Sequence, residues 1–221
     1  MGRAVVIGAS GGIGAALAQA LEARGDAVLR LSRRGDGLDL TDPVSVAAHL
    51  GRIEEPVDLA FIATGALEID GVEPEKTLRA LDPEAMLAQF RLNAIGPVLA
   101  LRHLLPHLPR DRVARVGILS ARVGSIGDNR LGGWYSYRAA KAALNQLIRT
   151  AAVEVARTHP KAVVGLLHPG TVATCFTAKY LGRHPAIAPG MAAADLIGVL
   201  ERLDAADSGS FHDRTGEVVP W

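Results

Sequence analysis

The chain has 221 residues and a formal net charge of +1, and 49% of its residues are apolar, enough for a fully buried core. No long run of like charge occurs, which argues against a partner such as nucleic acid or a membrane surface. The single cysteine, Cys175, excludes a disulfide framework within the chain and suits a reducing cytosol.

The order of the segments also favours a cytoplasmic protein. The first expected strand begins by Ala4, which leaves no room ahead of it for the charged and apolar regions of a signal peptide. The uncharged run from Leu92 to Leu101 is far shorter than the roughly 20 residues that a membrane span needs.

Apolar runs and helical periodicities alternate along the chain. The expected strands span 4–8, 27–32, 57–64, 112–120 and 162–167, with a short closing strand near 217–219. The expected helices span 12–24, a short stretch from Asp42-Pro43, a long stretch from Asp82-Pro83 to about His103, 136–158 and 189–203. Strands that are apolar throughout are typical of a parallel sheet covered on both faces. The pattern predicts one doubly wound α/β domain of the Rossmann type over residues 1–221, its parallel sheet flanked by helices on both faces.

A glycine cluster separates the first strand from the first helix. Glycines at such a turn let backbone N–H groups approach a pyrophosphate at the helix N-terminus. The alternative is a tight turn without a ligand. We interpret the cluster as a dinucleotide site whose contacts are Gly8, Ser10, Gly11, Gly12, Ile13 and Gly14.

The residues after the second strand indicate which dinucleotide is bound. An NAD site usually has an acid here for the ribose 2′-hydroxyl, whereas this chain has Ser32-Arg33-Arg34. Arginine binds phosphate bidentately, so we predict NADP, with NADPH preferred over NADH. The alternative is a pair of solvated arginines, with Asp36 as a competing acid. Asp39 and Leu40 follow, placed to meet the adenine.

Tyr137 is followed four residues later by Lys141, on the same face of an expected helix. A phenol beside a fixed ammonium has its ionised form favoured, so we expect the Tyr137 pKa to fall from about 10 toward a range useful for a general acid/base. The alternative is an ordinary exposed pair. Tyr135 has Ala139 at the equivalent position, so we expect it to be a packing residue or a pocket wall.

These motifs resemble those of the short-chain dehydrogenase/reductase family, nearest to its sniffer-type carbonyl reductases and C-factor-like proteins, over nearly the whole chain. The glycine cluster matches the family's Thr-Gly-x3-Gly-x-Gly loop, with Ile7 in place of threonine, and Tyr137 and Lys141 match its Tyr-x3-Lys. The segment 168–174 matches the Pro-Gly-x-Val-x-Thr stretch that lies against the nicotinamide. The resemblance thereby adds as cofactor contacts Pro169, Gly170, Val172 and Thr174.

The chain departs from the family in two places. Ile62-Ala63-Thr64-Gly65 stands where the family has Asn-Asn-Ala-Gly, so the resemblance implies cofactor contacts at Ala63, Thr64 and Gly65 without the asparagine side chains. The family's catalytic serine position falls on Ala121. Ser120 is one position away and Ser125 keeps the spacing to Tyr137. We take Ser120 as the candidate for the catalytic serine. Two alternatives stay open: that Ser125 has this role, or that no residue has it because Ala121 occupies the position.

The resemblance implies hydride transfer between a nicotinamide and a small carbonyl or alcohol substrate. Tyr137 would exchange a proton with the substrate oxygen, and Lys141 would lower the tyrosine pKa and bond the nicotinamide ribose. Ser120 would polarise the carbonyl, and Asn93 would hold a water that links Lys141 to solvent. The resemblance counts Asn93, Tyr137 and Lys141 as cofactor contacts as well.

The resemblance also predicts a homodimer or homotetramer, because helices 83–103 and 136–158 are the pair that this family uses for oligomer contacts. The segment 182–189 is expected to be a substrate lid. His103 and His107 have a spacing that can bind metal, but Pro106 lies between them and no carboxylate or cysteine completes a set, so no metal is predicted.

Two other functions compete with an oxidoreductase. A dinucleotide-binding sensor or signalling protein with little turnover is favoured by the C-factor-like motifs and the displaced serine. An isomerase or epimerase on the same scaffold is disfavoured, because no sugar-nucleotide domain follows.

Overall fold

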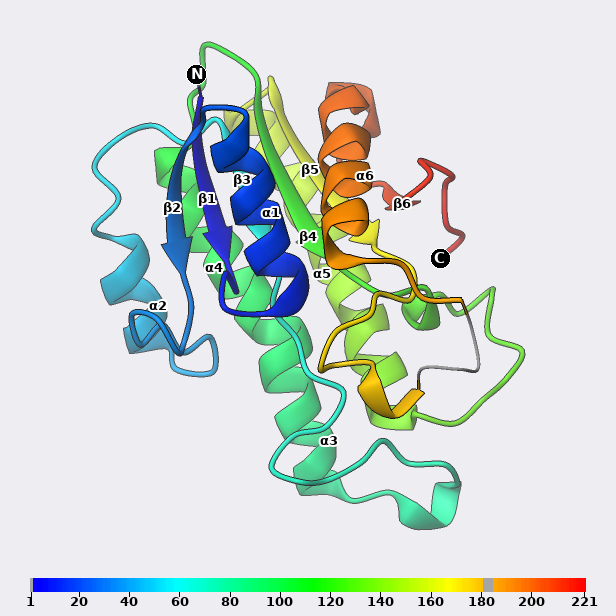
Figure 1. The fold of residues 1–221 in the computed structure, drawn as a ribbon. Coiled ribbons are helices and arrows are strands. Elements are labelled where there is room, and N and C mark those ends of the chain that lie inside the picture. Colours follow the sequence, from blue (N-terminus) through cyan, green and yellow to red (C-terminus); the bar gives the residue numbers. More distant parts are fainter. Residues whose placement is uncertain (1, 181–184) are drawn as a thin grey trace.

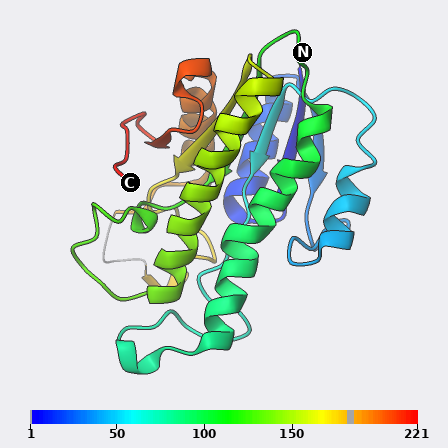
Figure 2. The ribbon, with the colours of Figure 1, turned by 180° about the vertical axis from the view of Figure 1, so that it is seen from behind.

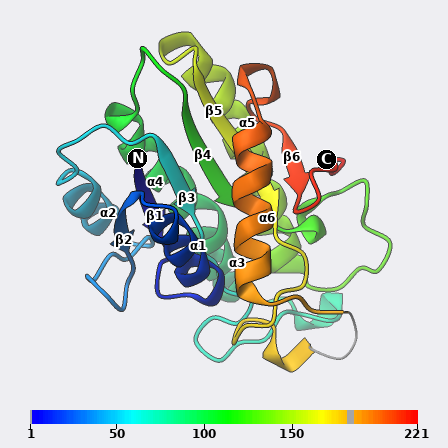
Figure 3. The same ribbon diagram turned by 45° about the horizontal axis from the view of Figure 1, so that its top comes forward.

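A six-stranded parallel sheet is the centre of the computed structural model, which describes residues 2–180 and 185–221. The strands are β1 (Arg3–Ile7), β2 (Ala27–Leu31), β3 (Leu59–Ile62), β4 (Ala114–Leu119), β5 (Ala162–His168) and β6 (Phe211–Asp213). Their order across the sheet is β2-β1-β3-β4-β5-β6, and every neighbouring pair is parallel (Figure 3). This arrangement confirms the predicted doubly wound α/β fold.

Helices cover both faces of the sheet. The helices are α1 (Gly12–Ala23), α2 (Pro43–Leu50), α3 (Pro83–Phe90), α4 (Gly96–Leu104), α5 (Tyr135–Thr158) and α6 (Pro189–Arg202). α1 and α6 lie side by side on one face (Figure 1), and α4 and α5 lie on the other (Figure 2). The residues of β1 alternate between two apolar cores, because successive strand side chains point to opposite faces. Val5 and Ile7 join the core under α4 and α5, whereas Ala4 and Val6 join the core under α1 and α6.

The helix expected from Asp82-Pro83 to His103 is interrupted in its middle. A π-helical turn (Arg91–Ile95) connects α3 to α4, and the Gly96 N–H donates to Arg91 O, five residues back. Pro97 follows and has no N–H to donate, so the regular ladder is already broken there. The prediction of one regular helix is therefore wrong in its centre.

The closing strand was predicted six residues too late. The strand that pairs with β5 is β6, at 211–213, whereas Val218 forms an isolated antiparallel bridge back onto His212. A turn at Gly216, with φ of 92°, reverses the chain between them. The segment near 217–219 thus folds back along β6 as an antiparallel bridge, and β6 itself is the last parallel strand. The other predicted elements end within one or two residues of those observed.

The sheet order places a crevice beside β1. The chain runs from β1 to β2 on one side and returns to β3 on the other, and ligands of such sheets bind beyond the carboxyl ends of the strands at this reversal. The residues that follow these three strands are Gly8, Ser32 and Ala63. Across the described ranges, no helix is both long and apolar enough to cross a membrane.

Candidate functional site

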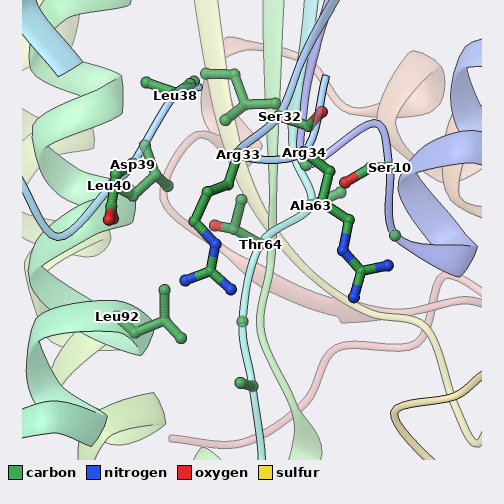
Figure 4. A pocket seen from close by; sticks show the side chains of 15 residues that line it. Ser10, Ser32, Arg33, Arg34, Leu38, Asp39, Leu40, Ala63, Thr64 and Leu92 are labelled. Carbon is green, nitrogen blue, oxygen red and sulfur yellow. The ribbon is translucent and has the colours of Figure 1, made fainter. Parts of the chain in front are cut away.

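A pocket of about 200 Å³ lies beyond the carboxyl ends of β1, β2 and β3 (Figure 4). Its lining contains eleven predicted cofactor contacts: Gly8, Ser10, Gly11, Ser32, Arg33, Arg34, Asp39, Leu40, Ala63, Thr64 and Gly65. Sequence reasoning missed four lining residues. Ile7, Leu38 and Ala66 each adjoin a predicted contact in sequence, so widening each motif by one residue would have found them. Leu92 comes from the π-helical turn and adjoins the predicted contact Asn93, so the same widening would have found it.

The glycine turn of this pocket cannot accept side chains. A Cβ at Gly8, whose φ is 91°, would lie 2.6 Å from Ala63 O, and one at Gly14 would collide with Gly8 O. Helix α1 begins after Gly11 with no side-chain cap and no acidic residue in its first turn, so its first N–H groups are left for a ligand. The Thr64 hydroxyl oxygen is buried and has no hydrogen-bond partner among the described residues. These features fit a dinucleotide phosphate.

Two arginines extend into the same pocket. Both line it together with Ser10, Thr64 and Leu92, and Figure 4 shows the two long side chains extended among them. The competing acid, Asp36, is turned into its own loop: its carboxylate accepts from Ser32 N at 2.7 Å, and it does not line the pocket. The two basic side chains, and not this carboxylate, are therefore available to a ligand in the part of the pocket next to β2.

Asp39 lines the pocket as a fixed carboxylate. It accepts from Thr41 N at 2.8 Å and from Thr41 Oγ1 at 2.7 Å. The backbone hydrogen bond from Thr41, together with the hydroxyl bond, lowers the Asp39 pKa. Its charge is thus held at the pocket rim by its own turn.

The predicted nicotinamide segment after β5 crosses the glycine turn. A Cβ at Gly12 would collide with the Thr174 side chain, so these two predicted contacts lie against each other. Val172 is buried and bridges to Ile187. The predicted contacts that stay outside the lining of the pocket are Gly12, Ile13, Gly14, Asn93, Tyr137, Lys141, Pro169, Gly170, Val172 and Thr174. Of the expected lid 182–189, residues 182–184 lie outside the described residues.

Tyr137 and Lys141 are both buried, one turn apart on α5. Lys141 Nζ donates to Leu119 O at 3.0 Å and lies 6.0 Å from the centre of the Tyr137 ring. Burial raises the pKa of the Tyr137 phenol and lowers the pKa of Lys141 to about 8. The expectation of a lowered tyrosine pKa is wrong for this structure, because loss of water around the phenol outweighs an ammonium that is bonded elsewhere.

Asn93 lies in the π-helical turn, and both ends of its side-chain amide are hydrogen-bonded. Its Oδ1 accepts from Ala66 N at 3.1 Å, and its Nδ2 donates to Ala66 O at 2.9 Å and to Gln89 Oε1 at 2.6 Å. A Cβ at Gly65 would lie 2.8 Å from Asn93 Oδ1 and 3.5 Å from Lys141 Nζ. Tertiary structure thus brings Asn93 and Lys141 together around Gly65. Gln89, which braces Asn93, carried no sequence signal.

The two candidate serines are both buried and both engaged. Ser120 Oγ donates to Asn145 Oδ1 at 2.6 Å, which commits its proton to a neighbour on α5. Ser125 Oγ accepts from Asp128 N at 3.1 Å and closes the turn that follows it.

Aromatic rings enclose the tyrosine on two sides. The Trp134 ring stands edge-on to Tyr137 and the Phe176 ring is tilted against it, each with ring centres 6.3 Å apart. Phe176 is 41% exposed, and its neighbour Cys175 is exposed as well. Two apolar rings, of which Phe176 is exposed, therefore pack against the buried phenol beside the segment that crosses the glycine turn.

Comparison with known proteins places this geometry in a family. The family model for short chain dehydrogenases matches residues 37–183. The 1-hydroxy-2-glutathionyl-2-methyl-3-butene dehydrogenase of Rhodococcus sp. (strain AD45) is 33% identical over 236 aligned positions that cover 100% of both chains. C-signal of Myxococcus xanthus is 34% identical over 64% of this chain and 81% of its own, which supports the C-factor-like resemblance.

A solved structure agrees in its fold. A short-chain dehydrogenase/reductase from Burkholderia multivorans with bound NADP superposes with a TM-score of 0.82 at 25% identity, covering 100% of this chain and 99% of that one. The family match spans Asn93, Tyr137 and Lys141, and the relative from Rhodococcus extends the similarity over the glycine turn. The chain belongs to the short-chain dehydrogenase family.

Proposed function

We propose that this protein is an NADP(H)-dependent oxidoreductase that interconverts a small carbonyl compound and its alcohol, with Tyr137 as general acid/base. One observation carries the proposal: a buried Tyr137–Lys141 pair lies one helical turn apart beside the site that the glycine turn and two arginines form. Family membership supports the reaction class.

The choice of NADP rests on Arg33 and Arg34. Two guanidiniums and the Ser10 hydroxyl line the part of the pocket beyond β2, while Asp36 is turned away. A 2′-phosphate would accept from these donors, whereas an unphosphorylated ribose would leave two cations unpaired. The similar Burkholderia structure with bound NADP supports the same choice.

The bound nicotinamide would supply or accept the hydride at the substrate carbon. In reduction, Tyr137 gives its proton to the substrate oxygen as the C–H bond forms, which leaves an alcohol and a phenolate that regains a proton through its surroundings. The raised pKa keeps the phenol protonated at neutral pH, which suits this direction. With its pKa of about 8, Lys141 is mostly protonated at pH 7, and its charge would favour the phenolate as that forms. Asn93 would hold a water beside Lys141. Ser120 would give up its hydrogen bond to Asn145 and donate to the substrate carbonyl, which polarises that carbonyl.

The surroundings of Tyr137 favour an apolar compound. Trp134 and Phe176 flank the phenol, and neither carries charge. The relative from Rhodococcus is named as a dehydrogenase of a short unsaturated alcohol that carries a bulky, polar glutathionyl group, so the preference for an apolar compound rests on the two rings alone. We therefore expect small aldehydes, ketones or their alcohols with apolar substituents as substrates.

We also propose a homodimer or homotetramer assembled through α3, α4 and α5. Large apolar side chains on these helices and the turn between them are exposed: Leu87, Ile95, Leu147 and Val153. Covering them in a second copy would remove apolar surface from water. Sedimentation velocity at several protein concentrations checks this, and a monomer throughout would contradict it.

A second candidate is a dinucleotide-binding signalling protein with little turnover. The similarity to C-signal favours it, as do the alanine at position 121 and the engagement of Ser120 with Asn145. Such a protein would bind NADPH tightly and leave every carbonyl compound unchanged.

The deciding experiment is a titration of NADPH and NADH, followed in the same sample by a panel of aldehydes, ketones and quinones. Tight binding of NADPH with its oxidation on part of the panel supports the oxidoreductase. Tight binding without oxidation supports the signalling protein. No binding of either nucleotide contradicts both.

A further inference from the structure

The first turn of α5 has no cap of its own. Its N-cap residue is Trp134, in the left-handed conformation with φ of 52° and ψ of 43°, and the side chain at this position makes no capping hydrogen bond. The first N–H groups of any helix need outside acceptors, and buried ones left without a partner are costly. Tyr137, the third residue of this helix, lies within that turn.

A distant residue supplies the acceptors. Glu75 Oε2 accepts from Ser136 N at 3.1 Å, and Glu75 Oε1 accepts from Ser136 Oγ. The backbone oxygen of Glu75 accepts from Trp134 N at 2.5 Å. Glu75 is only 7% exposed, so its carboxylate is committed to this turn. A carboxylate at a helix N-terminus also complements the helix dipole.

The segment that carries Glu75 is anchored at its other end to the catalytic machinery. Asn93 holds both backbone groups of Ala66, and Gln89 Nε2 donates to Leu67 O at 2.9 Å. In Figures 1 and 2 this segment, between β3 and α3, passes the N-terminal end of α5. One stretch of chain therefore connects the neighbourhood of Asn93 with the start of the helix that bears the tyrosine.

We propose that Glu75 is a positioning residue for the proton donor: by capping the first turn of α5 through Ser136 and Trp134, it fixes where Tyr137 presents its hydroxyl. The inference rests on the proposed function of Tyr137. Ser136 directly precedes Tyr137, and the Trp134 ring contacts the Tyr137 ring. A shift of this turn would therefore displace the phenol both through the backbone and through the ring contact. Misplacing a reacting group by about 1 Å can cost about 100-fold in rate.

The test compares Glu75→Ala with Glu75→Gln, which keeps an acceptor oxygen. Glu75→Ala should lower kcat by about 10- to 100-fold while NADPH affinity changes less than about threefold, and Glu75→Gln should restore most of the loss. Asp82→Ala is the matched control, because Asp82 accepts from Ala85 N and so caps α3, a different helix from the one that bears Tyr137. If Asp82→Ala lowers kcat as much, or if Glu75→Ala weakens only thermal stability, the inference is overturned.

A readout without turnover separates this inference from the proposed function. The chain has three tyrosines, so protein labelled with 3-fluorotyrosine gives three fluorine resonances that Tyr→Phe variants assign. Glu75→Ala should shift or broaden the Tyr137 resonance, Glu75→Gln should largely restore it, and Asp82→Ala should leave it in place. If the wild-type protein binds NADPH but reduces nothing, the proposed function fails and these spectra still decide the role of Glu75. An unchanged Tyr137 resonance in Glu75→Ala would overturn it.

Discussion

The proposed nucleotide end and the proposed catalytic end of this site are built in different ways. The nucleotide end consists of short contiguous stretches after β1, β2 and β3, and its two arginines are exposed. At the catalytic end, Asn93, Ser120, Tyr137 and Lys141 are buried, and hydrogen bonds to partners far along the chain hold three of their side chains. Backbone shape defines the first end, and long-range hydrogen bonds define the second.

The difference matters for what each end tolerates. Exposed arginines act largely through their own charge, so changing them should weaken one ligand contact and little else. Buried polar groups depend on one another, so changing one should disturb its partners.

The largest effect is expected at the catalytic end, from Tyr137→Phe. Loss of the proton donor should lower kcat by about 10²- to 10⁴-fold, the usual contribution of positioned proton transfer. NADPH affinity, measured by fluorescence titration, should stay within about threefold, because the nucleotide end is separate. Tyr135→Phe is the control, with near wild-type kcat expected. Equal losses in both variants would argue against Tyr137 as the donor.

The buried ammonium of Lys141 should appear in the pH dependence of stability. Its pKa is about 8 in the folded protein against an ordinary 10.5, so between these values the unfolded chain binds the extra proton and folding stability rises with pH. Relative to Lys141→Met, the free energy of unfolding of the wild type should rise by on the order of 3 kcal/mol as the pH rises across that interval. Below pH 8 the difference between the two proteins should not change with pH.

Urea unfolding at a series of pH values measures this difference. Lys161→Met, which changes an exposed lysine bonded to Asp111 O, is the control for the loss of a lysine side chain as such. A flat difference between wild type and Lys141→Met would mean that Lys141 is not desolvated in solution.

At the nucleotide end, the double variant Arg33→Ala/Arg34→Ala should raise the Kd for NADPH by about 10- to 100-fold, the value of a charge-assisted hydrogen bond or two. The Kd for NADH should change less than about threefold, since its ribose lacks the phosphate. Arg79→Ala, exposed and outside the pocket, serves as the control. Equal weakening of both nucleotides would remove the assignment to a 2′-phosphate.

The smallest effect is expected from the serines. Ser120→Ala should lower kcat by about tenfold or less, because its proton is already committed to Asn145. Ser125→Ala should mainly lower stability, because its oxygen closes the turn to Asp128. Steady-state kinetics and thermal unfolding on both variants distinguish the roles. A large kcat loss in Ser125→Ala alone would transfer the carbonyl-polarising role to Ser125.

The same contrast explains which features the sequence could predict. The glycine turn, the basic stretch after β2 and the alternation of strands and helices are local patterns, so their positions followed from the chain alone. The Tyr137–Lys141 spacing predicted two side chains on one helical face, and the structure has them there. The pKa of Tyr137 could not follow from that spacing, because burial depends on what covers the helix.

Tertiary structure alone decided how the catalytic end is held. Sequence could not pair Glu75 with Ser136, 61 residues apart, or Ala66 with Asn93, 27 apart, because hydrogen bonds between distant residues leave no periodic trace. It could not show the π-helical turn that precedes Pro97, or the return of 217–219 onto β6. Local stretches determine backbone conformation and so can be read in order, whereas the partners of a buried polar side chain are set by the packing of the whole chain.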